Sequence, residues 1–175
     1  VCILDSGVKL NHPEFSGRIW TNAKEIPGNN IDDDENDLID DFYGWDFVND
    51  DNDPTDDLGH GTNVAGITAA TGNNNIGYAG IDWNCKVMAL KGIDANNSGF
   101  YSWWISGIYY AVDNGAKVIN MSLGGSSNSA IMKDAINYAV DNGVVVVVCM
   151  MNTNSQNAFY PAAFPSVIAV GSTDP

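Results

Sequence analysis

One aspartate and one histidine are placed where they could act together as an acid–base pair. His60 stands between Gly59 and Gly61 in the stretch GHGTNVAG, at the start of an apolar, helix-forming run. The unsatisfied N–H groups at a helix N-terminus disfavour imidazolium, so this side chain is expected to be a neutral base near pH 7. The two glycines remove side chains that would crowd a substrate near the ring. Taken alone, a Gly-flanked histidine is equally well explained by a structural turn.

Asp5 is the candidate partner of His60. It directly follows the apolar run VCIL, and Ser6 and Gly7 turn the chain away after it. A carboxylate beside an imidazole fixes the tautomer of the ring and stabilises the imidazolium that forms during catalysis. A turn-forming Asx residue is the alternative interpretation of Asp5 alone. Together, the two side chains indicate general-base chemistry.

The segments that must position this pair follow a regular alternation of strands and helices. Apolar runs predict strands at 1–4, 86–93, 116–123, 144–150 and 166–172, and helical patterns cover 101–114 and 130–142. The repeated AVDNG at 111–115 and 139–143 marks two helix ends, each with Gly where a left-handed backbone is needed. These segments form consecutive βα units.

Uninterrupted apolar strands are typical of a parallel sheet that helices cover on both faces. We therefore expect an α/β fold, a three-layer sandwich with a mostly parallel central sheet. Ligand groups in such sheets gather beyond the carboxyl ends of the strands, where Asp5 is expected to lie. Residues 26–58 are rich in Asp and Asn and lack a long periodicity, which predicts a loop or insert anchored by Trp45 and Phe47.

The charge of the chain excludes several classes of partner. Its 175 residues include 22 acidic and 7 basic side chains, a formal net charge of -15. This charge disfavours nucleic acids and anionic membranes, because both need cationic contacts. It favours bound cations, and a merely solubilising acidic surface is the alternative. No apolar run reaches the roughly 18 residues of a membrane span.

The cysteines and the first residues give weaker signals. Cys2, Cys85 and Cys149 lie in apolar, strand-like segments without metal-type spacing, and are expected to be buried small hydrophobic residues. The chain opens on a buried-strand pattern without a methionine or a charged leader, so we expect it to be an excised piece.

Five sequence blocks carry a resemblance to a known family. They are ILDSGVKLNHPEF, GHGTNVAGITAA, SGFYSWWISGI, VINMSLGG and YPAAFPSVIAVGSTD. In this order, and over almost the whole chain, they resemble the catalytic domain of subtilisin-like serine proteases, the subtilases. The resemblance implies a subtilisin-like fold and an Asp–His–Ser triad, in which Asp5 orients His60 and His60 is the general base.

The resemblance places the nucleophile outside this chain. The family carries its serine in a G-T-S-x-x-x-P motif beyond the strand that SVIAVGS matches, and no serine here has that context. Residues 1–175 are therefore expected to be a partial peptidase domain that is inactive alone. The complete protein is expected to be a secreted serine endopeptidase that acts through an acyl-enzyme and is made with a propeptide. A catalytically inactive pseudoprotease or peptide-binding module is the alternative.

The resemblance also implies positions that bind a peptide substrate. Asn152 matches the asparagine whose amide donates to the oxyanion. Met151 stands where the family has Gly in the floor of its main specificity pocket, so either the pocket is partly filled or the local backbone differs. Packing of this methionine in the core is the alternative. The segments expected to bind an extended peptide contain Asn97, Ser98 and Gly99, and Ser122, Leu123 and Gly124.

Two stretches could hold Ca²⁺, which takes oxygen ligands from side chains and backbone. In GNNNIGYAG the resemblance implies a calcium loop, with ligands from the Asn74 side chain, the Gly72, Ile76 and Tyr78 carbonyls, and the Glu14 carboxylate. The oxygen spacing of DDDENDLIDD resembles the start of an EF-hand loop, although Asp37 replaces the turn glycine and Tyr43 replaces the closing Glu. Candidate ligands there are Asp32, Asp34, Asn36 and Asp40. A solvated acidic loop is the alternative.

Overall fold

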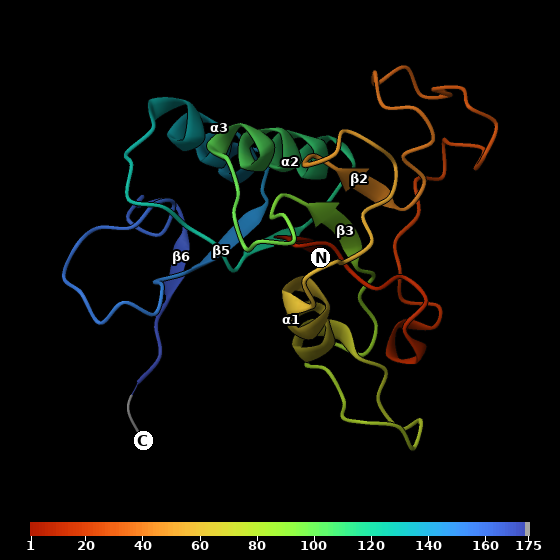
Figure 1. Ribbon diagram of the computed structural model, residues 1–175, viewed down its shortest axis with the longest axis horizontal. Coiled ribbons are helices and arrows are strands. Elements are labelled where there is room, and N and C mark those ends of the chain that lie inside the picture. The colour runs from red at the N-terminus through yellow and green to blue at the C-terminus, as the bar shows by residue number, and fades with distance from the viewer. Residues whose placement is uncertain (174–175) are drawn as a thin grey trace.

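Six parallel strands form the central sheet of the computed structural model, which describes residues 1–173 (Figure 1). The strands are β1 (Cys2–Asp5), β2 (Gly44–Asp46), β3 (Met88–Lys91), β4 (Val118–Met121), β5 (Val145–Cys149) and β6 (Ile168–Val170), in the order β2-β3-β1-β4-β5-β6. The helices are α1 (His60–Ala69), α2 (Tyr101–Asp113) and α3 (Ala130–Asp141), with a short 3₁₀ helix, η1, at Pro13–Phe15. All pairings between neighbouring strands of the sheet are parallel, which confirms the predicted α/β class.

Two hydrophobic cores lie on opposite faces of this sheet. Leu4 belongs to the larger core with residues of α2 and α3, whereas its neighbour Ile3 belongs to a smaller core with Ala65 and Ala69 of α1. Successive side chains of a strand point to opposite faces, and both Ile3 and Leu4 are 0% exposed. The part of the sheet formed by β1 and β3 is therefore covered on both sides, with α2 and α3 on one face and α1 on the other (Figure 1). Val145 of β5 and Ile168 and Val170 of β6 remain exposed, at 44%, 55% and 50%.

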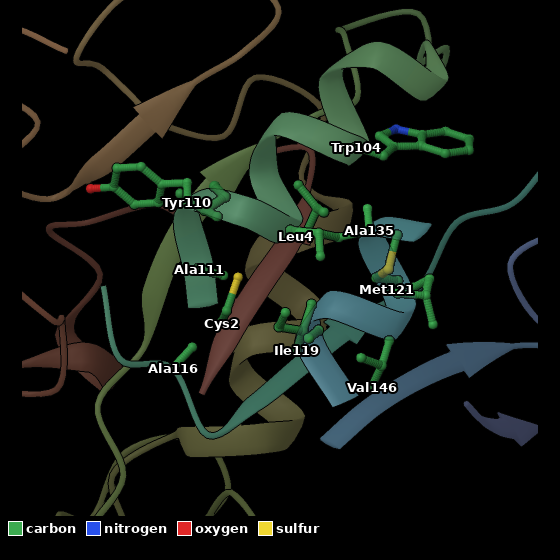
Figure 2. Packing of buried hydrophobic residues seen from close by; sticks show 14 of the residues in the cluster. Cys2, Leu4, Trp104, Tyr110, Ala111, Ala116, Ile119, Met121, Ala135 and Val146 are labelled. Atoms are coloured by element: carbon green, nitrogen blue, oxygen red, sulfur yellow. The ribbon is translucent and has the colours of Figure 1, made fainter. Parts of the chain in front are cut away.

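The larger core joins the sheet to α2 and α3. Figure 2 shows Leu4, Ile119 and Met121 of the sheet packed in one cluster with Ala111 of α2 and Ala135 of α3. All five side chains are 0% exposed. Burial of a Leu, Ile or Met side chain contributes about 1.5 to 3 kcal/mol, so this layer is a main source of the stability of the sheet.

The two AVDNG sequences end their helices as predicted. Asn114 and Asn142 are the C-caps of α2 and α3, and the glycines that follow them, Gly115 and Gly143, have φ of 77° and 76°. Glycine adopts this left-handed conformation without a Cβ clash, so the chain turns at once into the next strand.

The acidic segment 26–58 is not entirely a loop, so that part of the prediction was wrong. Gly44, Trp45 and Asp46 form β2, which pairs with β3 at one edge of the sheet. The strand has only three residues, too few for a periodic pattern. Gly44 has φ 118°, and a Cβ at this position would overlap the Ala89 carbonyl oxygen. Trp45 is 6% exposed and joins the larger core, which confirms its role as an anchor.

The cysteines differ in their surroundings. Cys2 is buried in β1, whereas Cys149 in β5 and Cys85, which lies before β3 and outside the strands, are both only partly buried. The expectation of three buried strand cysteines was therefore right for Cys2, wrong in burial for Cys149, and wrong in both respects for Cys85. In the described part of the chain, none of the helices has the length and apolar character needed to cross a membrane.

Gly44→Ala is expected to lower the free energy of unfolding by roughly 2 to 5 kcal/mol. The left-handed backbone disfavours a Cβ by about 1 to 2 kcal/mol, and displacement of the Ala89 carbonyl adds about 1 to 3 kcal/mol. The measurement is urea unfolding of both proteins. Gly28→Ala is the control, because Gly28 has φ 79° and no atom within 4 Å of the added Cβ. Equal losses in the two variants would contradict the close approach of β2 to β3.

Candidate active site

Asp5 and His60 meet at the carboxyl end of the central strand β1. Asp5 Oδ1 lies 2.6 Å from His60 Nδ1. The aspartate side chain is 0% exposed and the histidine side chain is 45% exposed, so the ring bridges the buried carboxylate and the surface. A hydrogen bond of this kind holds Nδ1 as the protonated nitrogen and leaves Nε2 available as a base.

The start of α1 is held against the end of β1 by a group of hydrogen bonds. Ser6 Oγ donates to Asp56 Oδ1 over 2.8 Å and accepts from the Gly61 N–H over 2.9 Å. Asp56 also accepts from the N–H groups of Gly59 and Thr62, at 2.7 and 2.8 Å. The group fixes where His60, the first residue of α1, emerges. The sequence analysis missed Asp56, whose only signal was an acid four residues before the histidine.

Glycine is required at the point where α1 crosses the turn after β1. A Cβ at Gly61 would overlap the Gly7 carbonyl oxygen and would lie 3.1 Å from the Asp5 Cβ. Gly59, the N-cap of α1, has φ 94°, with open space around the position of a Cβ. Gly61 therefore lets the helix approach the carboxylate, whereas Gly59 allows the left-handed backbone that precedes the helix.

Burial is the main influence on the electrostatics of Asp5. Desolvation raises the pKa of this carboxyl group, while hydrogen bonds from His60 and from the Ser6 N–H oppose the rise. Its second oxygen, Oδ2, is buried and has no hydrogen-bond partner among the described residues. Although burial opposes it, hydrogen bonds from Thr62 and Gly59 lower the pKa of Asp56. The pKa of Asp5 is therefore raised and the pKa of Asp56 is lowered.

A buried cation lies at the same edge of the sheet. Lys91 ends β3 and is 3% exposed, and its Nζ lies 2.9 Å from Asp46 Oδ2 and 2.8 Å from Asp57 Oδ2. Burial alone would lower the pKa of Lys91, but hydrogen bonds to Asp57 and Asp46 raise it. The ion pairs join β2, β3 and the loop before α1. They stabilise the side of the site that carries His60.

A cleft of about 350 Å³ begins at His60 and runs over the carboxyl ends of the strands. Its lining residues are His60, Ile93, Asn97, Gly99, Trp104, Ser122, Leu123, Gly124, Cys149, Met151 and Asn152. The structure thus brings together the histidine, Asn152 and most of the residues expected to bind substrate. Ser98 is not in the lining, and its carbonyl accepts from the Asp94 N–H over 2.8 Å.

No serine within residues 1–173 hydrogen-bonds to His60. Ser122 lines the same cleft, but its Oγ accepts from Asn120 Nδ2 over 3.0 Å. The described residues therefore pair an imidazole with a buried carboxylate, without a serine hydroxyl that hydrogen-bonds to the imidazole.

The loop 72–78 packs against an unpartnered buried carboxylate oxygen of Glu14. Asn74 Nδ2 donates to Glu14 Oε2 over 2.9 Å, while Glu14 Oε1 is buried without a partner among the described residues. Asn74 Oδ1 accepts from the Ile76 N–H over 3.1 Å. Gly77 has φ 47°, and a Cβ there would overlap Glu14 Oε1. The loop is wrapped around a carboxylate that lacks a counter-charge, which fits a cation. The remaining expected ligands, the carbonyls of Gly72, Ile76 and Tyr78, belong to this same loop.

A second acidic group differs from the predicted one. Ligand oxygens of Glu25, Asp32 and Asp34 lie within 4.8 Å of one another. Glu25 Oε2 and Asp34 Oδ1 are buried without partners in the described chain, and burial raises the pKa of Glu25. Glu25 was missed, because it lies outside the EF-hand-like spacing.

All four predicted ligands in the acidic segment have hydrogen-bond partners within the chain. The Asp32 carboxylate accepts the N–H groups of Asn36 and Asp37 over 3.1 and 2.7 Å, and Asp34 Oδ2 accepts from Asn22 Nδ2 over 3.2 Å. The Asp40 carboxylate accepts the N–H groups of Gly28, Asn29 and Asn30, at 2.7, 3.2 and 2.8 Å. Asn36 Oδ1 accepts from the Leu38 N–H over 2.8 Å. The structure brings Asp32 and Asp34 together with Glu25, and uses Asp40 to fold the preceding turn.

Three known proteins are similar to this chain over 99% of its length. The chain is 38% identical over 174 residues to a thermophilic serine proteinase from Bacillus sp. (strain AK1), covering 99% of this chain and 38% of that protein. It is 37% identical over 174 residues to thermitase from Thermoactinomyces vulgaris, covering 99% of this chain and 54% of thermitase. Subtilisin amylosacchariticus from Bacillus subtilis subsp. amylosacchariticus is 36% identical over 179 residues, covering 99% of this chain and 40% of that protein.

The chain spans about half or less of the length of these three relatives. The sequence profile of the Subtilase family matches residues 1–175. With its parallel six-stranded sheet and this match over its whole length, the chain belongs to the subtilase family.

Proposed function

We propose that the protein containing this chain is a serine endopeptidase that hydrolyses peptide bonds. The observation that carries the proposal is the 2.6 Å contact between the fully buried Asp5 and the half-exposed His60, at the mouth of a cleft. A buried acid, an oriented imidazole and a long open cleft are the parts that acyl transfer to a serine requires.

Each residue has one role in the proposed reaction. A serine oxygen attacks the substrate carbonyl carbon, and His60 takes the serine proton and passes it to the leaving amine. Asp5 keeps the ring oriented and stabilises the imidazolium. The Asn152 side-chain amide donates to the oxyanion of the tetrahedral intermediate. Water then hydrolyses the acyl-enzyme, with His60 again as the base. The serine is proposed to lie in a G-T-S-x-x-x-P segment after residue 175, so that residues 1–175 are part of one peptidase domain.

An extended peptide is the proposed substrate. The cleft passes between the segment of Asn97 to Gly99 and the segment of Ser122 to Gly124, both of which have backbone groups outside the strands. An extended chain can hydrogen-bond to such segments through its own backbone, and its side chains then enter separate subsites. The net charge of -15 argues against nucleic acids and anionic membranes as partners.

Ca²⁺ is the proposed bound ion at two places. Glu14 and Asn74 with the loop carbonyls would hold one ion, and Glu25, Asp32 and Asp34 would hold another. Support comes from the buried oxygens of Glu14, Glu25 and Asp34 that lack partners in the described chain. Such oxygens are costly unless a cation or a donor meets them. When bound, calcium would neutralise these carboxylates and stabilise two long loops.

The proposed setting is extracellular, with a propeptide in the complete protein. Calcium sites of moderate affinity are filled where the ion is abundant, outside the cell. A non-catalytic peptide-binding module is the second candidate function, and one observation favours it. Met151 occupies the cleft beside Asn152, so peptides could bind there without being turned over.

His60→Ala in the complete protein is expected to lower kcat by about 10⁶-fold, and Asp5→Asn by about 10⁴-fold, since the base or its orienting acid is lost. Hydrolysis of a fluorogenic peptide measures both. His12→Ala is the matched control, because the only other histidine of the chain accepts from the Glu14 N–H and lies outside the cleft. Unchanged activity of His60→Ala would exclude the protease.

A fluorophosphonate probe separates the complete protein from its first 175 residues. The complete protein is expected to be labelled at one serine, whereas residues 1–175 alone are expected to stay unlabelled. Labelling of the isolated chain would show that one of its own serines is activated. A complete protein that binds peptides but is never labelled would favour the second candidate function.

Asp5→Asn is expected to stabilise the fold at neutral pH. The pKa of Asp5 is raised by burial, so the folded state binds its proton more tightly than the unfolded state does. The wild type therefore loses stability relative to the variant as the pH rises from about 4 through the folded pKa. Thermal unfolding between pH 3 and 8 measures the difference. A wild type that gains stability over Asp5→Asn across this window would contradict the dominance of burial.

Removal of calcium is expected to lower the Tm by several degrees, because the buried carboxylates are then left uncompensated. Glu25→Gln should reduce the EDTA effect. Glu35→Gln is the control, since Glu35 is exposed in the same segment and lies outside the acidic group. The measurement is thermal unfolding in Ca²⁺ and in EDTA. A Tm that EDTA does not change would count against both sites.

A further inference from the structure

The deep end of the cleft is lined by sulfur-containing side chains. Cys149 ends β5, and Met150, Met151 and Asn152 follow it directly. On the other side, Leu123 and Gly124 follow β4, the strand that pairs with β5. We call the space lined by Leu123, Gly124, Cys149 and Met151 the slot.

The Met151 side chain bridges the two sides of the slot. Its Sδ lies 3.0 Å from the position that a Cβ on Gly124 would occupy, so the thioether rests against the opposite segment. The same sulfur lies 3.7 Å from Cys149 Sγ. It therefore contacts both sides of the slot at once.

The backbone conformation of Met151 directs its side chain across the slot. Met151 has φ 64°, in the left-handed region that non-glycine residues seldom adopt. Strained backbone of this kind persists only where the surrounding structure imposes it. Met150 differs from Met151, since it is 56% exposed, its Sδ lies 3.3 Å from the position of a Cβ on Gly171, and it does not line the cleft.

The proposed reaction determines what enters the slot. The scissile carbonyl must lie within reach of both His60 and the Asn152 amide, which lie in the same cleft. The side chain of the residue that supplies this carbonyl projects from the adjoining Cα. Because Met151 directly precedes Asn152, the space beside that Cα is the slot.

Resting on the proposed function, we infer that Met151 restricts the protease to small side chains, such as Ala, Ser or Gly, on the residue that supplies the scissile carbonyl. A methyl or hydroxymethyl group fits above the thioether. Leu or Phe would have to displace a side chain held against Gly124 and Cys149.

The test compares peptides that differ only in this residue, Ala against Phe, in the complete protein. The wild type is expected to favour Ala at least tenfold in kcat/KM, since one methylene in an apolar pocket already changes this ratio by about 10 to 200-fold. Met151→Ala and Met151→Gly are expected to raise Phe cleavage at least tenfold. Met150→Ala, the matched control, should leave the Ala to Phe ratio unchanged. A wild type that prefers Phe, or equal effects of the Met151 and Met150 variants, would overturn the inference.

A binding measurement keeps the inference separate from catalysis. Cys149 lines the slot, so a peptide acid whose last side chain enters it should slow alkylation of Cys149 by iodoacetamide, followed by mass mapping. In the wild type, a peptide ending in Ala should protect this thiol and one ending in Phe should not, whereas both should protect it in Met151→Gly. This pattern of protection without any peptide hydrolysis would support the restriction that Met151 imposes on the slot and would reject the proposed protease function. Equal protection by both peptides in the wild type would reject the slot.

Discussion

The hydrogen bond between the fully buried carboxylate of Asp5 and the imidazole of His60 is the contact on which the rest of this subtilase chain depends. Asp5 can be buried at that depth because β1 lies in the middle of the sheet, between β3 and β4. The same burial makes the ionised acid unfavourable, so the structure surrounds it with fixed donors, the His60 ring and the Ser6 N–H. The hydrogen bonds of Asp56 and Ser6, and the missing side chain of Gly61, hold α1 at the distance that this hydrogen bond needs.

Features that depend on local sequence could be predicted, and those that depend on contacts between distant segments could not. Continuous apolar runs indicated the parallel sheet, and the two AVDNG sequences indicated the helix ends, because each signal is contained in a few neighbouring residues. β2 was missed because it has three residues, and its strand character depends on pairing with β3. Glu25 was missed because only the folded loop brings it to Asp32 and Asp34.

Spacing alone does not show which acidic oxygens are free to meet an ion. Asp40 stands at a position where an EF-hand-like loop would use a ligand, but its two oxygens accept three backbone N–H groups of the preceding turn. Both oxygens of Asp32 likewise accept backbone N–H groups. The oxygens without partners, on Glu14, Glu25 and Asp34, are better evidence for cations than the number of acids. The same reasoning applies to Met151, whose importance depends on its backbone and its contact with Gly124 rather than on its residue type.

The order of the strands also governs how the chain can fold. β1 pairs with β3 and β4, so Cys2 finds its neighbours only at Met88 and Ile119. β1 therefore has no partner in the sheet until the chain has reached β3. When parallel strands lie far apart in the sequence, the chain loses the entropy of loop closure before any strand contact stabilises it. This makes folding slow. The position of His60 beside the carboxylate of that central strand consequently depends on pairings between segments far apart in the sequence.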